Sequence, residues 1–244
     1  MATLANIGRV FFGIAIAEMG LQALYFTDFP YMLLPPANVH APDVLAYALG
    51  IILAAAGACI IFLRKNRPIA IVLAFIFAGI ACLFLVPYEF IADSNRMHLG
   101  AWENAEKTLA LAGGVFIVAG FSGKFARLGP VIFGLMIIGF SLLHFVYAKE
   151  ASGYIPAWIP AHLFWMYFCG AALLGSGISI VLDIRVILIA AFLGLMVLTW
   201  FIILHVPKVI TAAPADFADE LTSAVLALAY SGTAFMIAGR TKKA

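Results

Sequence analysis

The side chains best suited to chemistry in this sequence are its histidines, because imidazole binds metals and exchanges protons near neutral pH. Two of the five, His144 and His205, stand near the ends of two apolar segments. If these segments cross a membrane in the same direction, the imidazoles lie at similar depth and could face one pocket. Such a pair could hydrogen-bond a quinone carbonyl, ligate haem iron, or form a metal site with a carboxylate. In a purely structural alternative, each imidazole is held by a nearby carboxylate or backbone carbonyl.

Further candidate ligand-binding residues accompany the histidine pair. His162 and Trp165 are three residues apart, so they share one face of a helix. Glu220 begins the last apolar segment, where it meets the positive end of a helix dipole and would orient a loop or His205. Haem is the least favoured ligand, because it needs a wide cleft of which the sequence gives no other sign. The expected pocket therefore consists of His144, His162, Trp165, His205 and Glu220.

Glu18 is a candidate of a different kind, because it is a carboxylate inside an apolar segment, where ionisable groups are costly. Gln22 stands one helical turn farther along and is its expected hydrogen-bond partner. The structural alternative is a protonated Glu18 that is hydrogen-bonded within the helix bundle.

Thiol redox chemistry is disfavoured by the arrangement of the cysteines. Cys59, Cys82 and Cys169 stand singly in three different apolar segments, whereas a redox centre needs a paired thiol such as Cys-x-x-Cys. They are better explained as packing residues. Since no complete catalytic motif is present, the sequence leaves open whether the protein is an enzyme.

These residues must be positioned by membrane helices, because the composition excludes a water-soluble globule and does not favour nucleic acid as a partner. Of 244 residues, 65% are hydrophobic and 11% are charged, and the mean hydropathy is +1.10. Eight apolar runs are each long enough to cross about 30 Å of hydrocarbon as a helix. We predict an all-α, polytopic integral membrane protein with eight transmembrane helices embedded in the lipid bilayer. The predicted spans are 6–26, 43–63, 68–90, 103–121, 128–148, 161–182, 185–206 and 217–239.

Charge distribution predicts the orientation of these spans. When eight spans alternate in direction, ten of the fourteen basic residues fall on one side, and the positive-inside rule places both termini in the cytoplasm. All five histidines then lie in the outer half. The outer connections 27–42 and 149–160 are rich in proline and aromatic residues, which favours the outer side as the working surface.

The sequence also contains an internal duplication. A shift of about 120 residues places IGRVFFG (7–13) over LGPVIFG (128–134) and Val86-Pro87 over Val206-Pro207, and a shift of 117 places Glu103 over Glu220. We therefore predict two tandem four-helix units, 1–123 and 124–244, in parallel orientation. The positions that match His144 and His205 are about Ala23 and Leu85, so only the second unit carries the histidine pair.

The second unit resembles the DoxX-like family of four-helix membrane proteins. The resemblance rests on SLLHFVYA (141–148), YIPAWIP (154–160), AHLFWMYFCGAALLGSG (161–177), LHVPKV (204–209) and DELTSAVLALAYSG (219–232). The first unit is similar more weakly, through VPYEF (86–90). The resemblance implies the bacterial cytoplasmic membrane and an association with quinone-linked oxidation of sulfur compounds or with oxidant-defence complexes, although fold similarity does not settle function.

Three functions remain as hypotheses. The first is a membrane subunit of a redox complex that interacts with quinone or lipid through the expected pocket, with other membrane subunits as partners. The second is a non-catalytic assembly or scaffolding subunit, favoured by the absence of soluble domains and of a complete catalytic motif. The third is a small-molecule transporter, although the sequence shows neither the broken helix nor the polar lining that would favour it.

Overall fold

The computed structural model describes residues 2–34, 42–63, 67–91 and 98–240. In these ranges the chain forms helices and no strands. A bilayer requires every backbone polar group to be satisfied within the protein, and helices achieve this inside each segment. The structure thus agrees with an all-α, multi-pass membrane protein. His40 and five of the basic residues used for the orientation, Arg64, Lys65, Arg96, Lys242 and Lys243, lie outside the described ranges.

Eight long helical segments can be followed through the described residues. Seven are long and apolar enough to cross a membrane, which confirms that part of the prediction. The eighth, α5, has 17 residues, a rise of about 26 Å, and begins with three charged side chains. The seventh segment continues to Thr211, five residues beyond its predicted end. The segments are α1 (Ala2–Phe26), α2 (Asp43–Phe62), α3–η2–α4 (Arg67–Ile91), α5 (Glu103–Ala119), α6 (Leu128–Val146), α8 (His162–Leu182), α9–η5–α10 (Val186–Thr211) and α11 (Phe217–Ala238).

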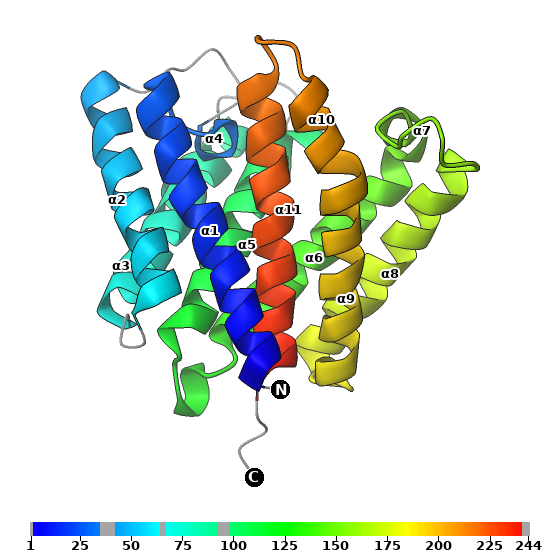
Figure 1. The fold of residues 1–244 in the computed structure, drawn as a ribbon. Helices are drawn as coiled ribbons and strands as arrows, with labels where there is room; N and C mark the ends of the chain where they lie inside the picture. Colours follow the sequence, from blue (N-terminus) through cyan, green and yellow to red (C-terminus); the bar gives the residue numbers. More distant parts are fainter. Residues whose placement is uncertain (1, 35–41, 64–66, 92–97, 241–244) are drawn as a thin grey trace.

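The helices pack around α5 and α11, which touch each other at the centre. Helix α1 packs between α2 and α11, and α6 packs between α8 and α5 (Figure 1). Helix α3 lies on α5, just as α9 lies on α11. The last long helix of each half of the chain therefore packs on the first helix of the other half.

Glycines allow the closest of these contacts, as is common where helices associate without a hydrophobic drive. Between α1 and α2, a Cβ on Gly13 would meet Gly57 O, and between α6 and α8 a Cβ on Gly134 would meet Gly177 O. These pairs are related by shifts of 121 and 120 residues. Side chains larger than hydrogen would push each pair of helices apart.

Two π-helical segments interrupt the third and seventh long helices at matching positions. They are η2 (Ile80–Leu85) and η5 (Phe201–His205), and each ends directly before a Val-Pro pair. Pro87 and Pro207 lack the N–H that an α-helix needs, and their rings crowd the preceding turn. The backbone forms a wider, π-helical turn instead, in which Val86 N–H donates to Ala81 O and Val206 N–H donates to Phe201 O.

One end of the bundle holds both ends of the described chain, and we call it the terminal end (Figure 1). Here Gly239 packs against Ala5. Arg9 donates to the carbonyls of Ile61 and Leu63 at the end of α2. The corresponding donation by Arg127, to Ile180 and Val181, occurs at the end of α8.

The opposite end, which we call the loop end, carries the short helices that connect the long ones. These are η1 (Tyr31–Leu33), η3 (Leu99–Trp102) and α7 (Ala148–Ser152). α4 (Val86–Ile91) and α10 (Val206–Thr211), which continue the third and seventh long helices, also lie at this end. Between the two ends, the outward faces present large apolar side chains such as Phe75, Leu83 and Phe192, which suits contact with lipid.

Candidate functional site

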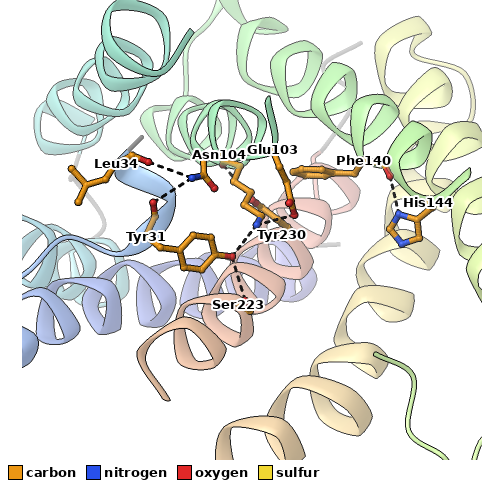
Figure 2. Close-up of polar contacts among 9 residues, drawn as sticks. Tyr31, Leu34, Glu103, Asn104, Phe140, His144, Ser223 and Tyr230 are labelled. Carbon is orange, nitrogen blue, oxygen red and sulfur yellow. Dashed lines mark hydrogen bonds and ion pairs between the residues drawn. The ribbon is translucent and has the colours of Figure 1, made fainter. Parts of the chain in front are cut away.

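A group of partly buried polar side chains lies at the loop end between η1, α5 and α11, and we call it the Lys107 cluster: Tyr31, Glu103, Asn104, Lys107, Ser223 and Tyr230 (Figure 2). Lys107 Nζ lies 2.8 Å from Glu103 Oε1 and donates to the Tyr31 hydroxyl, also at 2.8 Å. The same ammonium stands 4.7 Å from the centre of the Tyr31 ring. Since Lys107 thus has a counter-ion, an acceptor and an aromatic face, its charge is stable at a site largely removed from solvent.

The segment around η1 folds onto α5 and closes the loop end of the first half. Met32 and Leu33 are buried in the same apolar core as Phe12. Asn104 Nδ2 donates to the carbonyls of Tyr31 and Leu34, at 3.4 and 3.3 Å, and Thr108 Oγ1 donates to Met32 O at 2.9 Å. Side chains of α5 therefore satisfy backbone groups that the burial of this loop would otherwise leave unpaired.

The second half has a similar group at its loop end, which we call the Lys208 group: Tyr154, Lys208 and Glu220. Lys208 Nζ lies 3.3 Å from Glu220 Oε1 and 3.9 Å from the centre of the Tyr154 ring. The side chain of Lys208 is 28% exposed, against 15% for Lys107. Glu220 therefore links α10 to α11, as expected of a residue that orients a loop.

The expected pocket is not assembled as one site. Of its five residues, His144 Nδ1 donates to Phe140 O at 2.8 Å, which matches the structural alternative for a histidine held by a backbone carbonyl. Figure 2 shows His144 apart from the tyrosines of the Lys107 cluster. His205 Nδ1 is buried without a hydrogen-bond partner, within electrostatic reach of Lys107 and Lys208.

No hydrogen bond joins the two imidazoles, because equal depth does not fix the direction in which a side chain points. His162 begins α8, is only partly buried, and makes no hydrogen bond or ion pair. In the described part of the chain, no three His, Cys, Asp or Glu side chains gather as metal ligands. The arrangement of His144, His205 and Glu220 therefore does not make the metal site considered from the sequence.

Trp165 is the member of the expected pocket that does line a cavity. A groove of about 500 Å³ runs between α8 and α9. Its lining is almost entirely apolar, and Trp165 and Trp200 stand edge to face with ring centres 6.2 Å apart. The groove is lined by Trp165, Phe168, Cys169, Ala172, Ser176, Phe192, Leu193, Leu195, Met196, Thr199, Trp200 and Ile203.

The polar atoms of this groove are few. Trp200 Nε1–H donates to Cys169 Sγ at 3.1 Å, and Thr199 Oγ1 donates to Leu195 O at 2.9 Å. The Ser176 hydroxyl makes no hydrogen bond within the protein. The groove can therefore hold an apolar chain or a flat ring, with little polar recognition beyond Ser176 and the thiol.

Gln22 does not pair with Glu18, contrary to the expectation from the sequence. Its amide nitrogen donates to Ala218 O at 2.6 Å and to Thr222 Oγ1 at 2.7 Å, and its amide oxygen accepts from Thr222. Both partners are on α11, because this face of α1 packs on that helix. One carboxylate oxygen of Glu18 is buried without a hydrogen-bond partner.

The sequence reading missed two residues of α5, Lys107 and Glu106. The position of Lys107 four residues after Glu103 already indicated an ion pair on a helix face. The carboxylate of Glu106 fills the space that a side chain at Gly139 would need. Gly113 contacts Gly129 as Gly232 contacts Gly8, so Gly113 and Gly232 are matching positions that lie 119 residues apart. With this shift, Thr222 and not Glu220 matches Glu103.

Comparisons of this chain with protein-family models, with curated proteins and with solved structures gave no match.

Proposed function

We propose that this protein is a DoxX-like integral membrane subunit of a redox complex, and that it binds a quinone or another lipid in the α8–α9 groove. The observation that carries the proposal is the groove itself, whose volume of about 500 Å³ is within the range of small-molecule sites. Its lining from Trp165 to Ser176 follows α8 for about 16 Å, which suits an extended apolar tail. The two tryptophans at its loop-end part offer faces for a ring.

The proposal includes eight transmembrane helices in two tandem units, 1–123 and 124–244, with parallel orientation. The matching glycine contacts at Gly13 and Gly134 support it, as do the π-helical segments before Pro87 and Pro207. We place both termini in the cytoplasm of a bacterium, because the arginines that cap α2 and α8 lie at the terminal end with the chain ends.

The test is whether a ligand stays with the purified protein. Protein isolated in mild detergent is extracted with organic solvent, and quinones and lipids are quantified by mass spectrometry alongside the visible absorption spectrum. The variant Ala172→Phe fills the groove and should lower the retained ligand at least about tenfold, the equivalent of about 1.4 kcal/mol. The matched control is Ile52→Phe, which adds an aromatic ring to the exposed face of α2.

Two results would overturn the groove as the site: no quinone or lipid enriched over the bulk membrane, or equal enrichment in Ala172→Phe and in the parent protein. The scaffolding alternative predicts co-isolation with other membrane subunits from native membranes without any enriched ligand. A transporter would move a substrate across vesicles in the absence of partners.

A further inference from the structure

Two helix interfaces of the bundle repeat each other, the one between α1 and α11 and the one between α6 and α5. A Cβ on Gly8 of α1 would meet Gly232 O of α11, and a Cβ on Gly129 of α6 would meet Gly113 O of α5. Gly8 and Gly129 are 121 residues apart, and Gly113 and Gly232 are 119 apart. With these two shifts, any residue of one interface can be assigned its counterpart in the other.

By these shifts, a carboxylate stands at corresponding positions of the two repeats, but on opposite helices. In the second interface Glu106 belongs to α5, and it occupies the space over Gly139 of α6. The shift of 121 makes Glu18 of α1 the counterpart of Gly139. The shift of 119 makes Val225 of α11, which is buried in the apolar core, the counterpart of Glu106. Where α5 and α6 carry Glu106 against Gly139, the corresponding positions of α11 and α1 are Val225 and Glu18.

Among the described residues, neither carboxylate forms an ion pair. Oε2 is buried without a hydrogen-bond partner in both residues. The groups that act on Glu106 are Glu103 and Lys107 on its own helix and Tyr230 on α11. Lys107 is already engaged by Glu103 and Tyr31, and His144 on α6 is five residues beyond Gly139.

The surroundings of Glu18 are polar only toward the loop end. Gln22 on α1 and Thr222 on α11 bond to each other one turn away. Residues 50–57 of α2, which pack on this part of α1, are all apolar. An ionised carboxylate buried without donors or a counter-ion costs several kcal/mol, whereas the neutral acid does not carry this cost.

We infer that Glu18 and Glu106 are two intramembrane proton-binding sites of this protein, one in each of the two repeated interfaces, and that each carries its proton at neutral pH. This goes beyond the proposed function, since neither residue lines the α8–α9 groove. A carboxyl group held neutral between helices releases its proton only when water or a cation reaches it. The two sites therefore exchange protons when their interfaces open.

The direct test is modification by dicyclohexylcarbodiimide, which dissolves in membranes and converts protonated carboxyls to stable N-acylureas. In native membranes at neutral pH, peptide mass spectrometry should find Glu18 and Glu106 modified at least about tenfold more than Glu103 and Glu220, which form ion pairs with Lys107 and Lys208. Equal modification of all four, or no modification of either Glu18 or Glu106, overturns the inference. Glu106→Gln retains the shape of the side chain and should lose only the label at 106.

A second test exchanges the carboxylate across the interface. Gly139→Glu alone sets a second carboxyl against Glu106 and should lower the Tm by about 5 °C. The double variant Glu106→Val with Gly139→Glu reproduces the α1–α11 arrangement, so it should recover the Tm and show the carbodiimide label at position 139. A double variant that is no more stable than Gly139→Glu, or that folds but is unlabelled at 139, contradicts the equivalence of the two sites.

Discussion

The Lys107 cluster and the Lys208 group each contain a tyrosine, a lysine and a glutamate, but these side chains have different surroundings. In the first half, η1 folds inward and places Tyr31 against a lysine that is 15% exposed. In the second half, Tyr154 lies against a lysine that is 28% exposed, and no residue of η5 or α10 is buried. The difference lies in the loop: where a connecting segment enters the bundle, it covers the lysine of the ion pair, whereas the Glu103 side chain stays 45% exposed.

This comparison predicts its largest effect at the lysines. Lys107→Met leaves Glu103 and the Tyr31 hydroxyl without their partner, and should lower the free energy of unfolding by about 2 to 3 kcal/mol, or the Tm by roughly 4 to 12 °C. Lys208→Met is the matched change and should cost less than about 1 kcal/mol, because the Lys208 side chain is more exposed and its distance to Glu220 is longer, at 3.3 Å. Thermal unfolding in detergent measures both. Equal losses in the two variants would remove the distinction between the halves.

A smaller effect is expected where α5 holds the η1 segment. Asn104→Leu removes the donor to the carbonyls of Tyr31 and Leu34, which should cost about 1 to 2 kcal/mol. Deuterium exchange of the Leu33 and Leu34 amides should accelerate, since their turn depends on this docking. Ser152→Ala, which removes an exposed side-chain bond to Lys149 O in the second half, serves as the control. Unchanged exchange in Asn104→Leu would show that η1 is held without Asn104, by Lys107, Thr108 and its apolar side chains.

The smallest effect concerns the α8–α9 groove. Trp200→Phe retains the ring contact but removes the hydrogen bond to Cys169 Sγ, and reaction of this thiol with a membrane-permeant maleimide should rise about 2- to 10-fold. Trp165→Phe is the control, because Trp165 lines the same groove without bonding to the thiol. If both variants raise the reactivity equally, access to the groove and not the hydrogen bond controls it.

The membrane helices could be predicted from the sequence because the bilayer fixes both their length and their composition. The spans from Asp43 and from Phe217 end within a residue of the prediction. The seventh span runs on past Pro207 to Thr211, five residues beyond its predicted end. In a membrane the helix continues past this proline by widening into η5.

The candidate site was predictable only in part. The sequence indicates how deep a residue lies along a membrane helix, but it does not reliably indicate in which direction around the helix axis its side chain points. His144 and His205 are placed near helix ends as expected, but they make no contact with each other. Trp165 is a member of the expected pocket, and it does line a groove. The Lys107 cluster depends on a loop that folds back through the bundle, and no periodicity in the sequence marks such a contact.

The arginines that donate to the last carbonyls of α2 and α8 bear on how the chain enters the membrane during synthesis. Arg9 and Arg127 lie near the start of α1 and just before α6, and each finds its acceptors only when the following long helix has returned to the same side. Each pair of helices thus completes its own hydrogen bonds as a hairpin, before the rest of its half is made. The bundle can therefore insert into the bilayer as two hairpins, α1 with α2 and α6 with α8, and α5 and α11 then join them as the last helices of their halves.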